Sequence, residues 1–380
     1  MRKRFKSAAV ILVITLIMSF FFPNHTIALS IASDEKEAFE TAENLRVKIQ
    51  ENVPQCIWTE DTQCSRVTYL YDLDNRINGY IFEYSTLEKK TGYIQISTAL
   101  GYPILDSYAL EGVHWAAEKV YNTQDKLIYI GGISYYTKKE QLFSISDSIV
   151  SLSENDVMSS SKSELKQYYG MYLDNIRNSS KRQSAARGFN TITKFVQGYT
   201  GNITFATYAN TPYSQNIDCA RISALNVSIY WAKCRGKTGL YAGNVTTGYD
   251  QMANYIPIPD GRAMDQALYD GLYNYMKSKG YTPNYRGKIT FSSNNNTSTI
   301  GDGIWKWDEI KTLIDNGVPP NIAVCVPGGG YHAVVIMGYQ YIEVENTFMI
   351  LDATSTTTVY KTLSSFSPGC NIFSSYTGWR

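Results

Sequence analysis

The chain has 380 residues, of which 44% are hydrophobic and 18% charged, with 35 lysines and arginines against 34 aspartates and glutamates. Its length exceeds that of a typical single domain and predicts two globular units. Its apolar content is sufficient for a buried core. Because the charges balance, no overall field would attract nucleic acid or an anionic membrane surface.

The first thirty residues have the composition of a targeting segment. Residues 1–6 are basic, and an apolar run follows from Ala8 to Phe22. That run is shorter than a membrane-spanning helix, and no later apolar stretch is long enough to span a bilayer. Small residues near Ser30 would suit a signal peptidase. We therefore expect residues 1–30 to be a signal peptide and the protein to be secreted or held at the cell surface, with an uncleaved anchor as the alternative.

Residues 31–187 form the predicted N-terminal unit. A helix is expected over Glu35–Glu51, and turn residues separate four expected strands, at Val67–Leu73, Gly79–Tyr84, Gly92–Ser97 and Leu127–Gly131. A further helix is expected over Glu164–Arg177. Residues 178–188 are polar and basic, a composition typical of a solvated linker open to proteolysis.

Residues 188–380 form the predicted C-terminal unit, and its first chemical feature is Cys219. Ile222, Leu225 and Ile229 recur at helical spacing, and no glycine or proline interrupts before Gly236. Asp218 is a good N-cap residue, which places Cys219 in the first turn, where the helix dipole favours a thiolate. The Asp218 carboxylate should raise the thiol pKa, and Arg221 should offset it only in part. A nearby imidazolium must therefore supply most of the activation.

His332 is the only histidine after residue 114, so it is the expected base. It opens an apolar run, Tyr331–Tyr339, that reads as a buried strand. A second strand is expected over Phe348–Leu351 and ends at Asp352. If the two strands pair antiparallel, Asp352 returns beside His332 and can orient its ring. A core histidine and a turn-forming aspartate are the structural alternatives.

The order of Cys on a helix, His at a strand start and Asp at the end of the next strand resembles the papain-like cysteine peptidases. The nearest branches are streptopain and the peptidases that cut double-glycine leader peptides. Residues 307–326, an expected helix, an Asp-Asn-Gly-Val-Pro turn and a strand, resemble the segment that leads to the histidine in those families. The resemblance covers roughly residues 188–380, and the segment Thr91–Leu105 resembles a streptopain-like pro-segment.

The resemblance implies an α+β papain-like fold, with a helical lobe and an antiparallel sheet lobe, and a Cys219–His332–Asp352 triad. Oxyanion stabilisation needs the Cys219 backbone N–H and one side-chain amide. Gln215 is the best candidate and Asn216 the runner-up, although the family glutamine lies about six residues before the cysteine and Gln215 lies four before it. Ala220 stands where the family commonly has glycine or another small residue.

The remaining cysteines could form disulfides in a secreted chain. Cys56 and Cys64 are expected to form a local disulfide, and Cys325 to be a buried thiol. Cys234 lies too far along the helix to bridge Cys219, and it could pair with Cys370 or stay free. Three disulfides that include Cys219 are the alternative. No metal is expected because zinc ligands are lacking, no phosphate-binding loop is present, and no cofactor is expected.

Together these features predict a secreted cysteine endopeptidase that hydrolyses a peptide or protein substrate. The linker upstream of the thiol unit predicts a zymogen, in which the N-terminal unit covers the groove as an inhibitory pro-domain until cleavage near Lys181–Arg187; an ordinary interdomain linker is the alternative. The competing functions are an acyl transferase or amidase of the same superfamily and a catalytically inactive binding protein.

Overall fold

The computed structural model describes residues 33–121, 125–132, 135–137, 163, 165–174, 176–177, 192–201, 203–208, 210–211, 218–258, 265–290, 301–326, 330–342, 345–353, 358–362 and 373–379. The expected signal peptide, residues 1–30, and the expected linker, residues 178–188, lie outside these ranges. Within the described ranges, no helix has the length and apolarity needed to cross a membrane.

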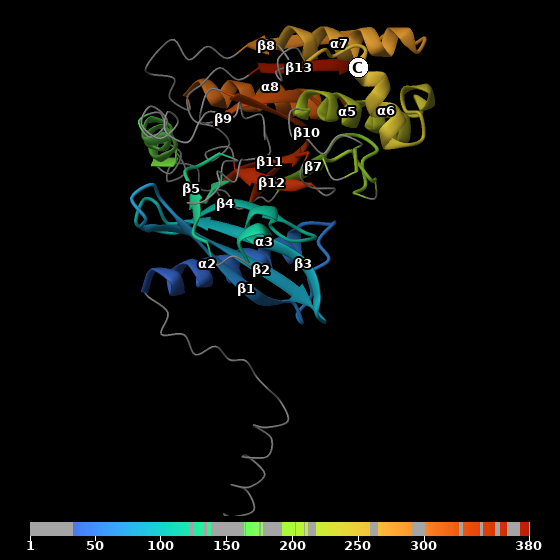
Figure 1. Cartoon of the computed structure of the whole chain (residues 1–380). Helices are drawn as coiled ribbons and strands as arrows, with labels where there is room; N and C mark the ends of the chain where they lie inside the picture. Colours follow the sequence, from blue (N-terminus) through green and yellow to red (C-terminus); the bar gives the residue numbers. More distant parts are fainter. Residues whose placement is uncertain are drawn as a thin grey trace, which may run out of the picture.

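The N-terminal half contains a long helix, a short helix and a run of mostly antiparallel strands (Figure 1). They are α2 (Ser33–Asn52), β1 (Gln63–Tyr71), β2 (Ile77–Thr86), β3 (Lys89–Ser97), β4 (Ile104–Ala109), α3 (Trp115–Tyr121), β5 (Leu127–Tyr129) and β6 (Tyr135–Tyr136). Residues 165–174 are helical as expected. Each expected helix and strand of this half is present, while β4, β6 and α3 are additions.

The C-terminal half combines helices with long buried strands. Its elements are β7 (Ile192–Phe195), α5 (Cys219–Arg235), α6 (Val245–Ala253), α7 (Asp265–Ser278), β8 (Tyr285–Thr290), α8 (Gly301–Asp315), β9 (Asn321–Val326), β10 (Gly330–Ile342), β11 (Glu345–Leu351), β12 (Val359–Thr362) and β13 (Phe373–Gly378). The helix expected from Cys219 and the strands expected around His332 and before Asp352 are all present. The fold is therefore mixed α and β, in line with the expected α+β class.

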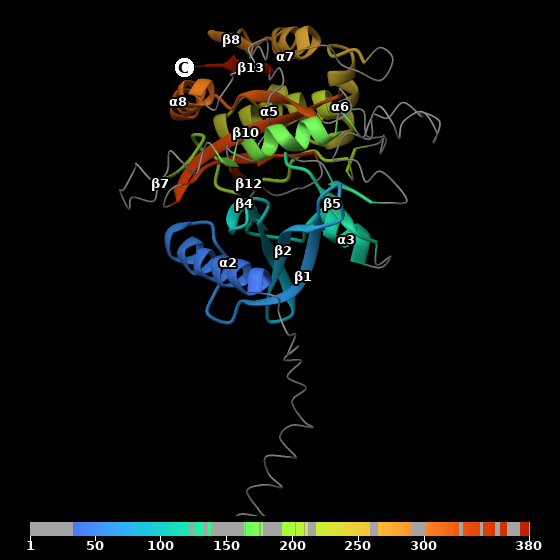
Figure 2. The same cartoon turned by 90° about the vertical axis from the view of Figure 1, so that its left-hand side faces the viewer.

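One sheet runs through both halves. Its strand order is β6-β5-β1-β2-β3-β4-β12-β11-β10-β9-β13-β8, with β7 added on β10. The two halves meet where β4 pairs antiparallel with β12, at Ser107 with Lys361, Tyr108 with Tyr360 and Ala109 with Val359. We call these paired strands the β4–β12 seam. Although the sequence predicted two units, the sheet is not interrupted between them (Figure 2).

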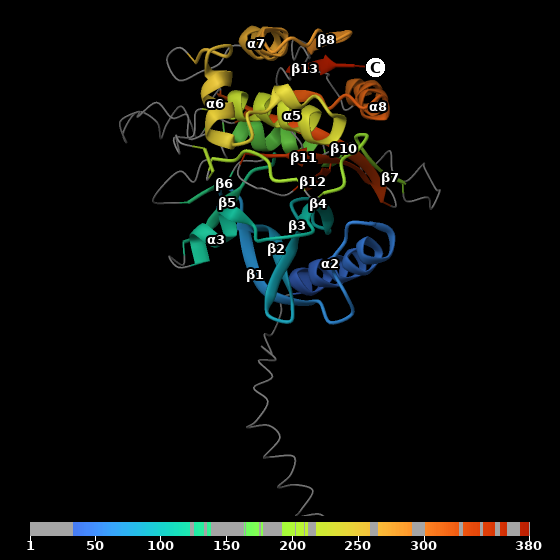
Figure 3. The same ribbon diagram turned by 90° about the vertical axis from the view of Figure 1, so that its right-hand side faces the viewer.

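Each face of the N-terminal sheet is covered by a different helix (Figure 3). On one face, α2 contributes Ala38, Ala42, Leu45 and Ile49 to a core with Phe82 and Ile94 of the strands. On the other face, α3 packs Ala116, Ala117 and Val120 against Tyr93 and Ala109.

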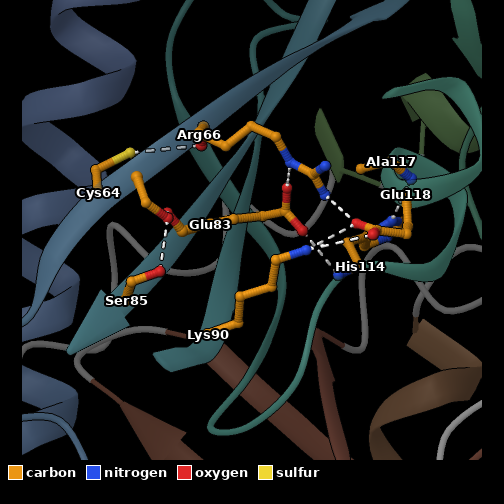
Figure 4. Close-up of polar contacts among 9 residues, drawn as sticks. Cys64, Arg66, Glu83, Ser85, Lys90, His114, Ala117 and Glu118 are labelled. Atoms are coloured by element: carbon orange, nitrogen blue, oxygen red, sulfur yellow. Dashed lines mark hydrogen bonds and ion pairs between the residues drawn. The ribbon is translucent and has the colours of Figure 1, made fainter. Parts of the chain in front are cut away.

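Polar contacts fasten α3 to the strands beneath it (Figure 4). The backbone N–H of His114, just before the helix, donates to Glu83 Oε1 at 3.1 Å. Arg66 pairs with Glu83 and with Glu118, the latter at 2.9 Å, and Lys90 approaches Glu118 at 3.2 Å. These charged groups fix α3 on the sheet face that continues toward the C-terminal half.

The face covered by α3 is also the face that carries His332. Directly paired residues of antiparallel strands point to the same side of a sheet. A row of such pairs runs from Tyr93 through Ala109, Val359 and Ile350 to Ile336. His332 lies four residues before Ile336 on β10 and therefore shares its side. Trp115, the first residue of α3, packs against the core of the C-terminal half, so the N-terminal half reaches toward the candidate site.

Candidate active site

Helix α5 positions Cys219 at its first residue. The helix is buried on nearly all sides, and it packs against β10. It ends at Gly236, which has a φ of 70° in the left-handed region and donates its N–H to the carbonyl of Trp231. Cys219 is only 7% exposed. The thiol therefore lies at the positive end of a buried helix, where the unpaired N–H groups of the first turn favour an anion.

Asp218 occupies the N-cap position, as predicted, but its side chain does not cap the helix. Instead, the carboxylate accepts a hydrogen bond from the Tyr249 hydroxyl and lies 3.4 Å from Arg221 Nη1. Its backbone carbonyl still accepts from the N–H of Ile222 at 2.9 Å. The charge of Asp218 is thus held by Arg221 and Tyr249 rather than by the N–H groups of the first helical turn.

Strand β10 positions His332 between β9 and β11. His332 pairs with Val324 on one side. On the other side, Val335 pairs with Leu351, so continuing the register sets Asp352 opposite Val334. His332 is the next residue along β10 on that same face. The predicted antiparallel return is present, and it brings Asp352 Oδ1 to 3.4 Å from His332 Nε2.

Both members of this ion pair are buried: the His332 side chain is 0% exposed and the Asp352 side chain 6%. Neither ring nitrogen has a well-aligned hydrogen bond to the described residues, so the His332–Asp352 contact is looser than a regular hydrogen bond. Catalytic hydrogen bonds are often long in a resting enzyme and shorten when substrate binds.

The Cys219 pKa is lowered from its ordinary value in spite of burial. Burial is the largest influence and raises this pKa, because a buried thiolate loses its hydration. The opposing influences prevail together: the side chain and charge of His332, and then the backbone N–H groups of Ala333 and Ala220. Cys219 and His332 therefore interact directly, and the sulfur lies against both α5 and β10.

The His332 pKa is raised to about 9. Burial is again the largest influence and lowers it, whereas interactions with Asp352 and Cys219 raise it. A lowered thiol pKa beside a raised imidazole pKa favours the thiolate–imidazolium pair at neutral pH. That pair is the reactive form of a cysteine nucleophile.

The other predicted site residues have different outcomes. Gln215 and Asn216, the candidate oxyanion donors, lie outside the described residues.

The expected disulfide between Cys56 and Cys64 is wrong, because both are free thiols. The physical reason for the error is that both pack against the α2 core as small apolar side chains, and burial raises the Cys64 pKa to about 12.

Neither Cys219 nor Cys234 forms a disulfide, which removes the alternative in which Cys219 is a disulfide partner. Burial raises the Cys234 pKa to about 11. The two cysteines of the same helix thus differ in the direction of their pKa shifts. Cys325 lies in β9, and Cys370 lies outside the described residues.

Tyr93 is a neighbour of the site that the sequence did not reveal. It belongs to β3 of the N-terminal half, and its ring is buried against His114, with ring centroids 4.7 Å apart. Burial and then the charge of Asp352 raise the Tyr93 pKa. No local pattern links residues 93 and 352, because their proximity depends on the pairing of β4 with β12.

Comparison with known proteins finds a family that the C-terminal half resembles. A family model described as the Peptidase_C39 like family matches residues 207–377. These residues are therefore similar to the Peptidase_C39 like family, and the match covers less than half of the 380-residue chain. The match begins before Cys219 and includes His332 and Asp352. No curated protein matches the chain.

Proposed function

We propose that this protein is a secreted cysteine endopeptidase that uses Cys219, His332 and Asp352 as a catalytic triad on a papain-like fold. The observation that carries the proposal is a buried thiol whose pKa is lowered by a buried imidazole, which itself faces a carboxylate. The family of residues 207–377 supports the same chemistry.

The geometry suits two-step acyl transfer. The Cys219 thiolate attacks the scissile carbonyl carbon, and the developing oxyanion accepts hydrogen bonds from the Cys219 N–H and the proposed amide of Gln215. The His332 imidazolium protonates the leaving amine, which departs and leaves a thioester. Neutral His332 then takes a proton from water, whose oxygen attacks the thioester and releases the acid. Asp352 keeps the ring oriented and stabilises its cationic form.

Hydrolysis of a quenched fluorescent peptide library tests this proposal. We expect Cys219→Ala to lower the turnover of a cleaved peptide by at least about 1,000-fold, because the nucleophile is lost. Cys234→Ala is the matched control, since it removes a free thiol from the same helix whose pKa is raised. It should keep activity within about threefold of wild type.

Three results would favour other functions. Full activity in Cys219→Ala would remove the thiol from the reaction. Transfer of the acyl group to an added amine in preference to water would identify an acyl transferase. Absence of both turnover and alkylation of Cys219 at pH 6 would identify an inactive binding protein on this scaffold.

We further propose that the protein is made as a zymogen and is activated by a cut near Lys181–Arg187. The supporting features are the basic, polar sequence there and the burial of the site, in which Cys219 is 7% exposed and His332 0%. Mass spectrometry of the active enzyme should find a new N-terminus within this segment. A fully active, uncut chain would refute the zymogen.

A further inference from the structure

The β4–β12 seam joins the two proposed units by more extensive contacts than an inhibitory domain that dissociates would need. It is a strand pairing within the continuous sheet, with three residue pairs in register. Separating the halves would leave β4 and β12 as two new edges with unpaired backbone N–H and carbonyl groups. β12 also pairs with β11, the strand that ends beside Asp352. The seam is therefore one strand away from the candidate triad.

A buried charge pair crosses the seam. Lys361 of β12 places its Nζ 2.8 Å from Asp106 Oδ1, and the side chains are 3% and 1% exposed. Asp106 is the extra residue of a bulge in β4, because Gln95 pairs with Ser107 while Ile96 pairs with Leu105. Bulges redirect side chains, and this one presents the carboxylate to Lys361.

Tyrosines of the N-terminal half complete the environment of this pair. The Tyr129 hydroxyl donates to Asp106 Oδ2 at 2.6 Å and lies 3.4 Å from Lys361 Nζ. Tyr172 also donates to Asp106 Oδ2, at 3.3 Å. Lys361 thus lies among polar groups of the N-terminal half. Separating the two halves would leave Lys361 and Asp106 without their ion-pair partners. Uncompensated buried charges are strongly unfavourable.

The opposite face of the seam is apolar and aromatic. Tyr108 of β4 stacks on Tyr360 of β12, with ring centroids 4.4 Å apart. The Tyr108 hydroxyl also donates to Gln340 of β10. Tyr360 and Met349 of the C-terminal half belong to the same buried core as α2. Both faces of the sheet are therefore continuous across the boundary.

We infer that the N-terminal half remains bound after the linker is cut, so that the mature enzyme has two chains held together at the β4–β12 seam by Lys361 and Asp106. This inference rests on the proposed zymogen and specifies the form that its activation produces. Cleavage near Lys181–Arg187 severs the connection but leaves the shared sheet intact. The N-terminal half is then a permanent support for the strands next to Asp352.

The test replaces residues 181–187 of the full-length protein with the recognition sequence of a specific protease. After complete cutting, size-exclusion chromatography without denaturant, over a dilution series, reports whether the two fragments elute together. We expect co-elution at every dilution for the wild-type seam. Lys361→Met should weaken the association by about 100-fold or more. Lys311→Met is the matched control, because Lys311 makes an ion pair with Asp308 at the surface, and it should not change the elution.

A double variant separates a lost charge pair from a lost fold. Asp106→Asn combined with Lys361→Met removes both charges and keeps an oxygen acceptor for Tyr129, so it should restore part of the co-elution. Should Lys361→Met fail to fold before cutting, the dilution series on the cut wild-type protein decides alone.

Two outcomes would overturn the inference. They are separation of the cut wild-type fragments in native buffer, and association of cut Lys361→Met as tight as wild type. Peptide hydrolysis, measured on the same samples, is scored independently. Fragments that separate and are active would refute permanent docking and leave the peptidase in place. Fragments that co-elute and are inactive would refute the peptidase and leave the docking in place.

Discussion

At the scale of single residues, the candidate site depends on a balance between burial and local charge. Burial alone would keep the Cys219 thiol neutral, and it would also keep His332 neutral. His332 lowers the Cys219 pKa and Cys219 raises the His332 pKa, in each case against the effect of burial. Asp352 also raises the His332 pKa. The reactive state is therefore a property of the group and should be lost when one member is removed.

Alkylation of the thiol tests this dependence. In wild type, iodoacetamide should label Cys219 readily near pH 7, because the thiol pKa is lowered. In His332→Ala, burial dominates and raises the thiol pKa, so the labelling rate at pH 7 should fall at least about tenfold, which corresponds to one pKa unit. Mass spectrometry of the labelled peptide measures the rate. His114→Ala, which removes a buried histidine distant in sequence, serves as the control; an unchanged rate in His332→Ala would contradict the proposed pairing.

Asp352→Asn tests the third member of the proposed triad. Asp352 helps to raise the His332 pKa to about 9, so the variant should have a lower His332 pKa. The alkaline limb of kcat/KM should move to lower pH, and kcat should fall about 100-fold to 10,000-fold. A pH–rate profile unchanged from wild type would remove Asp352 from the mechanism.

The same pKa predicts the pH dependence of stability. A histidine whose folded pKa is about 9, above its unfolded value of 6.5, stabilises the fold fully below pH 6.5. That contribution disappears as the pH rises through 9. The stability deficit of Asp352→Asn, measured by urea unfolding, should therefore be largest at pH 6 and smaller at pH 9.

The sequence predicted Cys219, His332 and Asp352 because each stands at an element boundary and because only one histidine follows residue 114. It did not predict the partners of Asp218. A carboxylate at an N-cap is expected to bind the first turn of its own helix, but Tyr249 of α6 and Arg221 compete for it. Side-chain competition of this kind depends on packing between helices, which local patterns do not encode.

At the scale of elements, helix α5 shows how closely the ends of a secondary structure control the site. It begins at Cys219, the proposed nucleophile, and ends at Gly236, where the chain turns in the left-handed region. A shift of either end would change the depth of Cys219 against β10. The termination at Gly236 is therefore part of what places the thiol.

Gly236→Ala should lower the free energy of unfolding by about 1 kcal/mol, because alanine is strained at a φ of 70°. No atom lies within 4 Å of the position that the added Cβ would take, so strain alone is tested. Gly170→Ala is the matched control in a helical segment with equally open surroundings, and it should raise stability by roughly 0.5 kcal/mol. Urea denaturation measures both; equal effects would contradict the role of Gly236.

The long elements could be predicted, because α2, α5 and β10 carry strong periodicity or continuous apolar runs. The elements that were missed are short. β4, β12 and α3 have six, four and seven residues, and such segments carry little local information. They are nevertheless the elements that join the two halves.

At the scale of the whole molecule, the continuous sheet predicts cooperative unfolding. The two predicted units share a sheet, a charge pair and a buried core. The pairing of β4 with β12 connects residues about 250 positions apart in sequence. This pairing could not be predicted from composition, because composition shows only the linker between the two units.

Lys361→Ala tests this cooperativity in the uncut protein. Removing one partner of a buried pair should cost about 3 kcal/mol, and the loss should lower a single transition shared by both halves in scanning calorimetry. Lys311→Ala should change stability by less than about 0.5 kcal/mol. Two separate transitions, of which only one responds to Lys361→Ala, would show that the halves unfold independently.

The placement of β13 has a consequence for biosynthesis. Residues 373–378 insert between β9 and β8, so β8 has no place in the sheet until residues 373–378 have been translated. A nascent chain that already carries Cys219, His332 and Asp352 still lacks the strand that flanks β9, the neighbour of β10. The β9 side of the sheet can therefore be completed only after the strand at residues 373–378 has been synthesised.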